Sequence, residues 1–417
     1  MAKSGGEVAA DAGVDWISAL PDDILVFILL RLDTIAEAAR TGVLSHRWRR
    51  VWALLPVLLF PDGRHIRFLR LALPSSGAFA RLAELGLKRV RFQGPLKLGD
   101  VVSSPRSPCL RILSVCDSFG VDSLTVHSKS LLRMELSSLN GLQELTIDAP
   151  ALKELQLLYC FDQIQPVVDI AAPQLVSLYW NDACHRISVQ LGNLGQLQLL
   201  STNYILVYGP QCTRRHNHEI QWLLQRFQAI HSLDIMLFYG SVDIDKLQYL
   251  MEDMTHLPHV TFLRVDVLNE GHAFGAGLFH VLRLGTRIRN LSLRLQLQET
   301  LKEQSPCQPG CSCEQPTNWM TEELLLNCLQ EVEISFLRGW EHEVIFVKQL
   351  FKWASVLEKM TIIFHQSIGC SKAMELCQTI SSFTRPETCV EFYMYDDAGR
   401  RPLRLLAPEI QGTGMRL

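Results

Sequence analysis

The stretch DWISALPDDILVFILLRLDTIAEAARTGVLSHRWRRVWALLPVLLF, from Asp15 to Phe60, decides how the N-terminal part of this chain folds. Its apolar spacing predicts three short helices. The first helix begins at Pro21, because the fixed backbone angle of proline suits the first helical position. Asp22 and Asp23 follow in the opening turn, where negative charge interacts favourably with the helix dipole.

The second and third helices carry start signals of their own. Thr34 and Glu37 form a capping-box pair for a helix from Ile35 to about Thr41. Ser45 is the N-cap predicted for the third helix. Three large apolar residues of that helix fall on one face at helical spacing: Trp48, Val51 and Trp52.

The first helix is apolar nearly all round its cylinder, from Ile24 to Leu32. A surface helix needs only one apolar stripe, so this helix must be covered on more than one side. A unit of about 45 residues buries too little of its own surface to supply that cover. We therefore expect part of the helix to pack on another protein. The alternative is cover from the rest of this chain, and periodicity alone does not decide between them.

The segment resembles an F-box in the order and type of its residues. The resemblance rests on Asp15, Ile17, Ser18, Leu20 to Leu25, Ile28, Leu29, Leu32, Ala39 to Thr41, Leu44, Ser45, Arg47, Trp48 and Trp52. Ala36 to Ala39 departs from the family, in which bulkier residues are common. The resemblance implies docking on the small adaptor of Skp–cullin–F-box (SCF) complexes and, through it, on a cullin-based ubiquitin ligase. We expect adaptor contacts from a set that also has to build the three-helix core: Leu20, Pro21, Ile24, Leu25, Ile28, Leu29, Leu32, Leu44, Trp48 and Trp52.

Composition sets broad limits. The 417 residues suffice for about two or three domains with a large core. A hydrophobic content of 48% argues against disorder, and a net charge of -3 gives no sign of nucleic-acid or membrane binding. The start lacks the apolar segment of a secretory signal, and no run approaches the ~20 apolar residues of a membrane-spanning helix. We expect a soluble protein of the cytoplasm and/or nucleus, where the 12 cysteines stay reduced.

After the F-box, an apolar-x-x-apolar-x-apolar unit recurs, which is the strand part of a leucine-rich repeat. One occurrence is weak because leucine is common, but the series predicts a curved solenoid with one concave strand face. The occurrences are Leu110/Leu113/Val115, Leu131/Met134/Leu136, Leu142/Leu145/Ile147, Leu152/Leu155/Leu157, Leu175/Leu178/Trp180, Leu194/Leu197/Leu199, Ile230/Leu233/Ile235, Val260/Leu263/Val265, Ile288/Leu291/Leu293, Leu329/Val332/Ile334 and Leu357/Met360/Ile362.

The segments between these strands differ along the chain. Those of the first half are short and contain turn residues, so little helix is expected there. In the second half, helical spacing predicts helices around 220–227, 247–254 and 344–351. The outward positions beside the strand leucines are candidates for a target-binding surface, although solvated strand positions look the same: Arg133, Glu135, Glu144, Thr146, Glu154, Gln156, Ser177, Tyr179, Ser292 and Arg294.

The predicted organisation is an α+β and α/β repeat protein with five parts. Residues 1–14 form a flexible tail, 15–60 the F-box, 61–314 the leucine-rich-repeat solenoid and 396–417 a C-terminal tail. Residues 315–395 resemble the FBD region of plant F-box proteins. That resemblance rests on Asn318, Trp319, Leu329 to Ile334, Phe336, Gly339, Glu343, Leu350 and Leu357 to Ile362. It implies about two helix–strand units, with a final strand at 389–395, that cap the open end of the solenoid.

Chemistry-bearing motifs are few. Cys307, Cys311 and Cys313 are the best metal candidates, but zinc needs four ligands and the nearest fourth cysteine is Cys328. A loop of reduced thiols is therefore preferred, and neither a metal nor a cofactor is predicted. The run from Arg214 to His218 is interpreted as a solvated loop before a helix. We find no phosphate loop, nucleophile elbow or zinc-protease helix, and predict no enzymatic activity.

Two functions remain open at this point. In the first, the chain is the substrate-recognition adaptor of an SCF ubiquitin ligase, with an unknown protein target on its repeats. In the second, it is a repeat scaffold or ligand receptor that acts without ubiquitin. Binding to a Skp-type adaptor separates the two. Nothing in the sequence identifies the target.

Overall fold

The computed structural model describes residues 20–29, 51, 54–60, 69–72, 79–93, 97–139, 141–161, 165–182, 184–240, 244, 246–285, 287–296, 311–314, 317–395 and 402–405. The first tail and most of the second and third helices predicted for the F-box lie outside these residues. The predicted first helix is α1, Asp22–Leu29, with both aspartates in its first turn.

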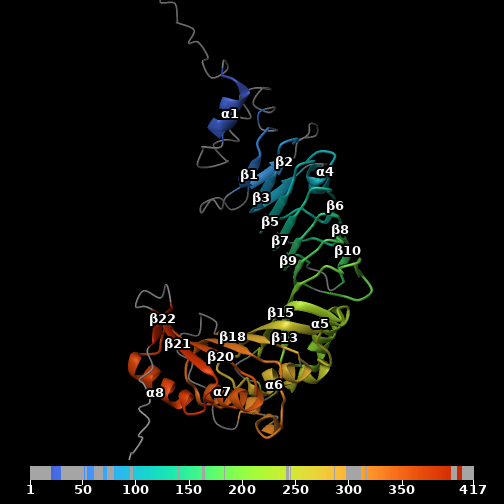
Figure 1. Cartoon of the computed structure of the whole chain (residues 1–417). Helices are drawn as coiled ribbons and strands as arrows, with labels where there is room; N and C mark the ends of the chain where they lie inside the picture. The colour runs from blue at the N-terminus through green and yellow to red at the C-terminus, as the bar shows by residue number, and fades with distance from the viewer. Residues whose placement is uncertain are drawn as a thin grey trace, which may run out of the picture.

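The main sheet contains fourteen of the described strands, arranged side by side in the order of the chain. All neighbours are parallel except the last pair. Figure 1 shows that the sheet bends into an arc. The strands are β1 Val57–Phe60, β3 Glu84–Lys88, β5 Ile112–Cys116, β7 Arg133–Ser137, β9 Glu154–Leu158, β11 Ser177–Asn181, β13 Leu199–Leu206, β15 Ala229–Phe238, β17 His259–Leu268, β18 Asn290–Gln296, β19 Glu331–Leu337, β20 Lys359–Phe364, β21 Cys389–Tyr395 and β22 Pro402–Leu405.

In the N-terminal half, the strands of the main sheet are backed by further strands. A four-stranded parallel sheet is formed by β6 Ser123–His127, β8 Glu144–Asp148, β10 Val167–Ala171 and β12 Val189–Leu191. A parallel pair, β2 Leu69–Ala72 and β4 Val90–Gln93, and the short helix α4, Leu98–Val102, precede it. The unit Leu142/Leu145/Ile147, expected in the main sheet, therefore belongs to β8. The reason is that consecutive strands of this part of the chain lie alternately in the main sheet and in the four-stranded sheet.

The repeats of this half share a turn at the end of the main-sheet strand. The residue after each of β3, β5, β7 and β9 has a positive φ, and its N–H donates to the carbonyl that ends the next strand of the sheet. These residues are Arg89, Asp117, Ser138 and Tyr159. A residue in the left-handed backbone conformation lets the chain change direction within a tight turn. The turn thus directs the chain away from the main sheet towards the opposite side of the repeat.

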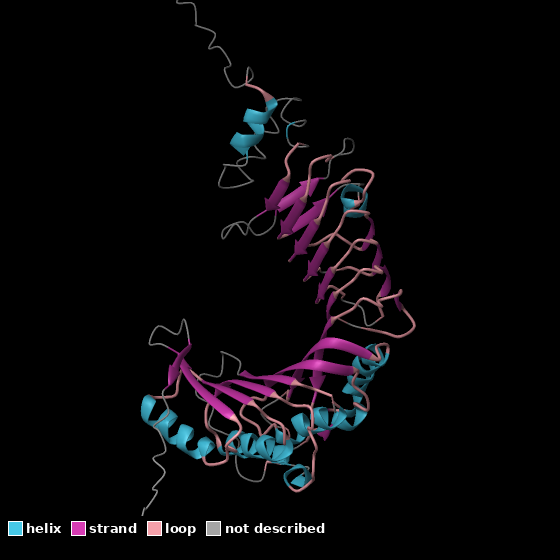
Figure 2. Cartoon of the chain, in the orientation of Figure 1, coloured by secondary structure: helices cyan, strands magenta, loops and turns pink. Residues whose placement is uncertain are grey.

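In the C-terminal half, helices replace the second sheet. α5 Arg214–Gln225, α6 Gly275–Leu284, α7 Glu341–Trp353 and α8 Cys370–Ser381 lie along the outer side of the sheet, as Figure 2 shows. The helices predicted around 220–227 and 344–351 correspond to α5 and α7. Short 3₁₀ turns complete the connections: η1 Gln211–Thr213, η2 Met251–Asp253, η3 Ser312–Glu314 and η4 Thr317–Met320.

The helix predicted around 247–254 is wrong. The segment forms β16, Gln248–Tyr249, followed by η2. β16 pairs with β14, Tyr208–Gly209, in an antiparallel ladder. Pairing with a distant segment overrides local helical spacing here, because apolar residues at three- and four-residue intervals also suit a buried turn.

One apolar core runs through the repeats from Leu25 to Phe392. The expected strand leucines fill it, with one change of register: Leu200 is buried, whereas Leu199 is only half-buried on the open side. The parallel sheet and the mixed helix and strand content predicted from the sequence are confirmed. β21 has the bounds expected for the final strand, and β22 lies in the stretch predicted as a tail. No helix among the described residues is long and apolar enough to cross a membrane.

Candidate functional site

The helix α1 presents apolar side chains to solvent. Ile24 is 45% exposed and Phe27, three residues later on the same face, is 53% exposed. Leu25, in contrast, is 1% exposed and belongs to the core that includes Val51 and Leu55. The carbonyl of Pro21 accepts the N–H groups of Ile24 and Leu25, which fixes the start of the helix. The structure thus separates one core residue from an exposed apolar pair.

The residues expected to contact an adaptor fall into three groups. Ile24 and Pro21 are exposed, whereas Leu20 is half-buried against the core and Leu25 is fully buried. The side chains of the other six lie outside the described residues: Ile28, Leu29, Leu32, Leu44, Trp48 and Trp52. Phe27 was not in the expected set, although it follows Ile24 at helical spacing in the same apolar run.

A second surface is the strand face that points away from the helices. Along each strand, buried residues alternate with half-buried ones, and the buried ones face the helical layer. On the open face of β15, β17 and β18, two acidic and two basic side chains meet: Asp234, Arg264, Asp266 and Arg294. We call this group the charged quartet. Figures 1 and 2 show the helices on the outer side of the arc, so the open strand face is its inner side.

The charged quartet pairs between neighbouring strands. Arg264 Nη1 lies 2.9 Å from Asp234 Oδ2. Arg294 contacts Asp266 through both Nε (2.6 Å) and Nη2 (2.5 Å). Burial raises the pKa of Asp234 although Arg264 acts in the opposite direction, and the hydrogen bond to Asp266 raises the pKa of Arg294. The four side chains therefore fix each other in place, with donor and acceptor edges at a surface that a protein could contact.

The surface residues predicted from the sequence lie partly on this open face. Six are on the main-sheet strands β7, β9 and β11: Arg133, Glu135, Glu154, Gln156, Ser177 and Tyr179. Ser292 and Arg294 are on β18, where Ser292 is buried. Glu144 and Thr146 are not on this face, because β8 belongs to the second sheet. The sequence interpretation missed Asp234, Arg264 and Asp266, although they follow the same alternation.

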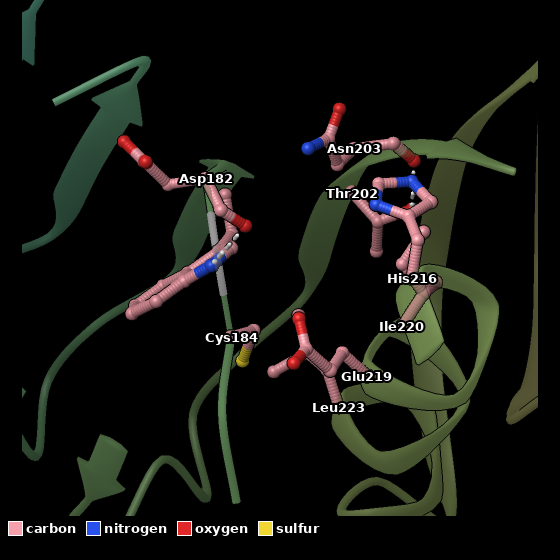
Figure 3. A pocket seen from close by; sticks show the side chains of 9 residues that line it. Asp182, Cys184, Thr202, Asn203, His216, Glu219, Ile220 and Leu223 are labelled. Carbon is pink, nitrogen blue, oxygen red and sulfur yellow. Dashed lines mark hydrogen bonds between the residues drawn. The ribbon is translucent and has the colours of Figure 1, made fainter. Parts of the chain in front are cut away.

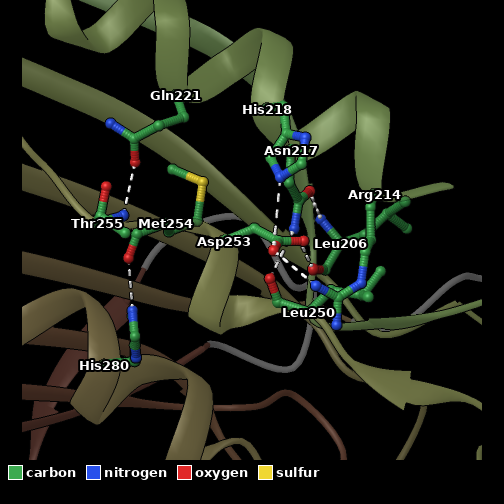
Figure 4. A network of polar contacts seen from close by, with 10 residues as sticks. All are labelled: Leu206, Arg214, Asn217, His218, Gln221, Leu250, Asp253, Met254, Thr255 and His280. Atoms are coloured by element: carbon green, nitrogen blue, oxygen red, sulfur yellow. Dashed lines mark hydrogen bonds and ion pairs between the residues drawn. The ribbon is translucent and has the colours of Figure 1, made fainter. Parts of the chain in front are cut away.

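The run from Arg214 to His218 is not a loop. It forms the first turns of α5, and Figure 4 shows how its polar groups hold neighbouring segments. Asn217 is fully buried, accepts the N–H of Leu206 (3.0 Å) and donates to the carbonyls of Leu206 (2.9 Å) and Leu250 (3.2 Å). Arg214 lies 2.9 Å from Asp253. The sequence interpretation failed because these polar residues satisfy backbone groups of distant segments, which spacing does not reveal.

A small cavity between β11, β13 and α5 combines residue types found in some active sites. Its volume is about 10 Å³, room for about one water, and Cys184, His216 and Glu219 are among its lining residues (Figure 3). Burial raises the pKa of the Cys184 thiol, which disfavours the nucleophilic thiolate. Asp182 accepts the backbone N–H groups of Cys160 and Phe161. The cavity therefore gives no support to a catalytic role.

One group of described residues has the composition of a metal site. His272, Cys311 and Cys313 place their ligand atoms within 4.8 Å of one another. Cys307, the first cysteine of the sequence motif, lies outside the described residues. Cys328, considered above as the nearest fourth ligand, is exposed and is not in this group. His272 was not considered in the sequence interpretation, because it precedes Cys311 by 39 residues.

Comparison with known proteins identifies two segments in the N-terminal half of the chain. The F-box domain family matches residues 17–60, which include α1. A family described as "FBD-associated F-box protein At5g56370, LRR repeats" matches residues 60–196, from the end of β1 through β12. The chain carries an F-box followed by leucine-rich repeats. The FBD assignment of residues 315–395 lies beyond both matches and stays a prediction.

Relatives of this F-box chain occur in Arabidopsis thaliana. "Putative FBD-associated F-box protein At3g60710" is 31% identical over 156 residues, which are 34% of this chain and 42% of that protein. "F-box protein At1g80960" is 53% identical over 53 residues, 13% of this chain and 11% of that protein. "Putative F-box/FBD/LRR-repeat protein At4g03220" is 28% identical over 177 residues, 41% and 35%. The chain thus spans less than half the length of each of these three relatives.

Proposed function

We propose that this chain is the substrate-recognition adaptor of an SCF ubiquitin ligase. The F-box binds a Skp-type adaptor and, through it, a cullin, while the open face of the repeats binds a target protein. The observation that carries the proposal is the exposed pair Ile24 and Phe27, which lies inside the F-box match. Burying one such side chain contributes about 1.5–3 kcal/mol, enough for two neighbours to dominate an interface.

In this proposal the chain makes or breaks no bond itself. It holds a lysine of the target near a ubiquitin-loaded carrier and so raises the effective concentration of the reacting groups. The charged quartet supports binding of a protein, because paired charges at the open face favour a partner with complementary polar groups. We propose the cytoplasm and/or the nucleus as its location, because the free cysteines suit a reducing compartment.

Co-purification with a Skp-type adaptor tests the proposal. The double variant Ile24→Asp/Phe27→Asp places two charges on the exposed apolar pair and should abolish binding. Leu25 is left unchanged, since a charge at this buried position would unfold the F-box itself. The matched control is Ile187→Asp in the repeats, an apolar side chain that is 75% exposed and distant in sequence from α1.

The expected result is a loss of adaptor binding of at least about 100-fold in the double variant, from two lost hot-spot contacts. The control should bind like the wild type, and circular dichroism should show both variants folded. A folded double variant with unchanged adaptor binding would contradict the proposal. It would favour a scaffold or receptor that acts without ubiquitin.

A further inference from the structure

Two segments far apart in sequence meet at the carboxyl end of β17. The first is the turn 269–272, which leads from β17 towards α6, and the second is η3 with its preceding residue Cys311. Cys311 Sγ lies 3.5 Å from His272 Nδ1, and Cys313 Sγ accepts the N–H of Ala273 at 3.3 Å. Hence two sulfur atoms and one imidazole nitrogen converge on one point.

The histidine side of this cluster is built by a tight turn. Glu270 and Gly271 both have positive φ angles, 50° and 88°, as in a type I′ turn. The N–H of His272 donates to the carbonyl of Asn269 at 2.8 Å, and the Asn269 amide donates to the carbonyl of His272. His272 is buried. Its imidazole is therefore held in position by the turn rather than left on a flexible loop.

The cysteine side is fixed by contacts on both sides of Ser312. Tyr208, in the short strand β14 that follows β13, donates its hydroxyl to the Ser312 carbonyl at 3.3 Å. Cys313 is buried, and the backbone N–H of Ala273 points at its sulfur. An N–H donor stabilises a thiolate, the form in which cysteine binds metals. Cys311 is half-buried, so solvent can reach the cluster from its side.

We propose that His272, Cys311 and Cys313 form a zinc-binding site. In a tetrahedral zinc site, with Zn–S about 2.3 Å and Zn–N about 2.0–2.1 Å, sulfur and nitrogen ligands lie about 3.5–3.6 Å apart. The separation of 3.5 Å between Cys311 Sγ and His272 Nδ1 agrees with this value. Two thiolates and one imidazole favour Zn²⁺ over the harder Mg²⁺ and Ca²⁺. A water molecule from the Cys311 side completes the four ligands.

The site ties the connection between β18 and β19 to the rest of the sheet. Without metal, η3 is held by the hydrogen bonds of Ser312 and Cys313 described above. With metal, two bonds from Cys311 and Cys313 and one bond from His272 link the η3 segment to the turn before α6 through the ion. Zinc thus acts here as a structural link in the C-terminal half and is independent of the proposed ligase function.

The test is zinc binding by the full chain, purified under reducing conditions with its Skp-type adaptor or alone. Mass spectrometry of the metal content should show one zinc per chain. Titration with Co²⁺ should give the thiolate-to-cobalt charge-transfer absorption of a cysteine-bound ion. His272→Asn, Cys311→Ser and Cys313→Ser each remove a ligand and should weaken zinc binding at least about tenfold, since losing even an outer-shell partner of a ligand has an effect of that size. The matched controls Cys328→Ser and His259→Asn change exposed residues and should bind like the wild type.

A second measurement uses the wild type and does not depend on the folding of variants. Zinc should protect Cys311 and Cys313 from alkylation, with Cys328 reacting at the same rate with and without the metal, and a chelator should remove the protection. Equal alkylation of Cys311 in both conditions would overturn the proposal. So would zinc binding that His272→Asn and Cys313→Ser leave unchanged, and either result would leave the adaptor-binding test unaffected.

Discussion

The two halves of the repeat array back the main sheet with different elements: strands in the N-terminal half and helices in the C-terminal half. β5, β7 and β9 begin at residues 112, 133 and 154, whereas β15, β17 and β18 begin at 229, 259 and 290. The short repeats have room only for a second strand, whereas α6 and α7, helices of 10 and 13 residues, occur in longer repeats. The long repeat from β15 to β17 contains β16 and η2 instead of an α-helix. A short repeat therefore leaves room only for a backing strand, and a long repeat allows a helix without requiring one.

The backing also affects the bend of the sheet. Strands lie about 4.8 Å apart, and packed helices about 8–10 Å. A sheet backed by helices must curve so that its outer layer has more room, whereas a sheet backed by strands need not. Figure 1 agrees, since the arc turns more strongly from β15 to β22 than from β1 to β9. β13, between the two halves, has a shift of register between Ser201 and Tyr204.

A variant with a large predicted loss of stability, Phe346→Ala, tests whether the two halves of the repeat array unfold separately. Phe346 on α7 is fully buried, with its ring centroid 5.3 Å from that of Phe274 and 6.0 Å from that of Trp353. Phe346→Ala should cost about 3–5 kcal/mol because it leaves a cavity. In a repeat array this loss should stay local, so hydrogen exchange should accelerate in α6 and α7 but not in β5 to β9.

Leu155→Ala in β9 is the matched variant of the other half. Leu155 is fully buried too, and its loss should cost about 2–5 kcal/mol and accelerate exchange in β7 to β11. If either variant accelerated exchange equally in both halves, the array would behave as one cooperative unit. The two halves would then differ in architecture alone and not in how they unfold.

A smaller effect is expected at the junction of the halves. Asn217→Ala removes three hydrogen bonds that join α5 to the end of β13 and to Leu250. The buried backbone groups left behind should cost about 2–3 kcal/mol, measured by denaturant unfolding. His218→Ala, in the same turn but exposed, should change stability by less than about 0.5 kcal/mol. Equal effects of the two variants would show that the junction does not depend on Asn217.

A pH-dependent effect is predicted in the helical half. Glu343 Oε2 accepts the N–H groups of Arg338, Gly339 and Trp340 before α7, and burial raises the pKa of this carboxyl from 4.5 to about 7. Glu343→Gln keeps one accepting oxygen but introduces a buried NH2 donor, and should cost about 1–3 kcal/mol.

The sign of this pH dependence follows from proton binding. Between pH 4.5 and about 7 the native state holds a proton at Glu343 that the unfolded chain has released, so wild-type stability falls as pH rises. Glu343→Gln lacks this term. The unfolding free energy of the wild type minus that of Glu343→Gln should therefore decrease from pH 4.5 to about 7. A value that stays constant or increases over this range would contradict the assignment.

The smallest effect compares ion pairs on the open face. In the C-terminal half, Arg294 makes two contacts with Asp266. In the N-terminal half, Arg133 makes a single contact of 3.4 Å with Glu154. Because both arginines are more than 40% exposed, Arg294→Ala should cost about 1 kcal/mol or less and Arg133→Ala only a few tenths. Unfolding in low and high salt measures the difference, which should shrink as salt rises. A larger loss of unfolding free energy for Arg133→Ala than for Arg294→Ala would contradict this ranking of the two ion pairs.

Local patterns predicted the parts of the fold that depend on neighbours in sequence. Strand positions such as Leu263 and Val332 were correct because each repeat carries its own alternation of buried and open residues. The register at Leu199 and Leu200 was wrong, since two adjacent leucines fit either face. The helix expected around Met251 was wrong because Tyr249 pairs with Tyr208 across more than 40 residues.

The candidate sites depended more on contacts between distant residues. The F-box pattern identified the region of Ile24, but it did not separate this exposed residue from the buried Leu25 beside it. The charged quartet could have been found by continuing the alternation into β15 and β17. The approach of His272 to Cys311 could not have been predicted, because no local spacing relates a turn after β17 to the connection before β19.

The direction of β22 sets a limit on how the array can grow. Among the described strands of the main sheet, β22 alone runs against its neighbour. A duplicated repeat enters between existing repeats with its strand parallel to both, so insertion in the interior preserves every pairing. Beyond β22 the same unit would meet a reversed edge. Gene duplication in the middle of the sheet thus preserves the parallel pairing, whereas a repeat strand of the same direction added beyond β22 would pair with it antiparallel.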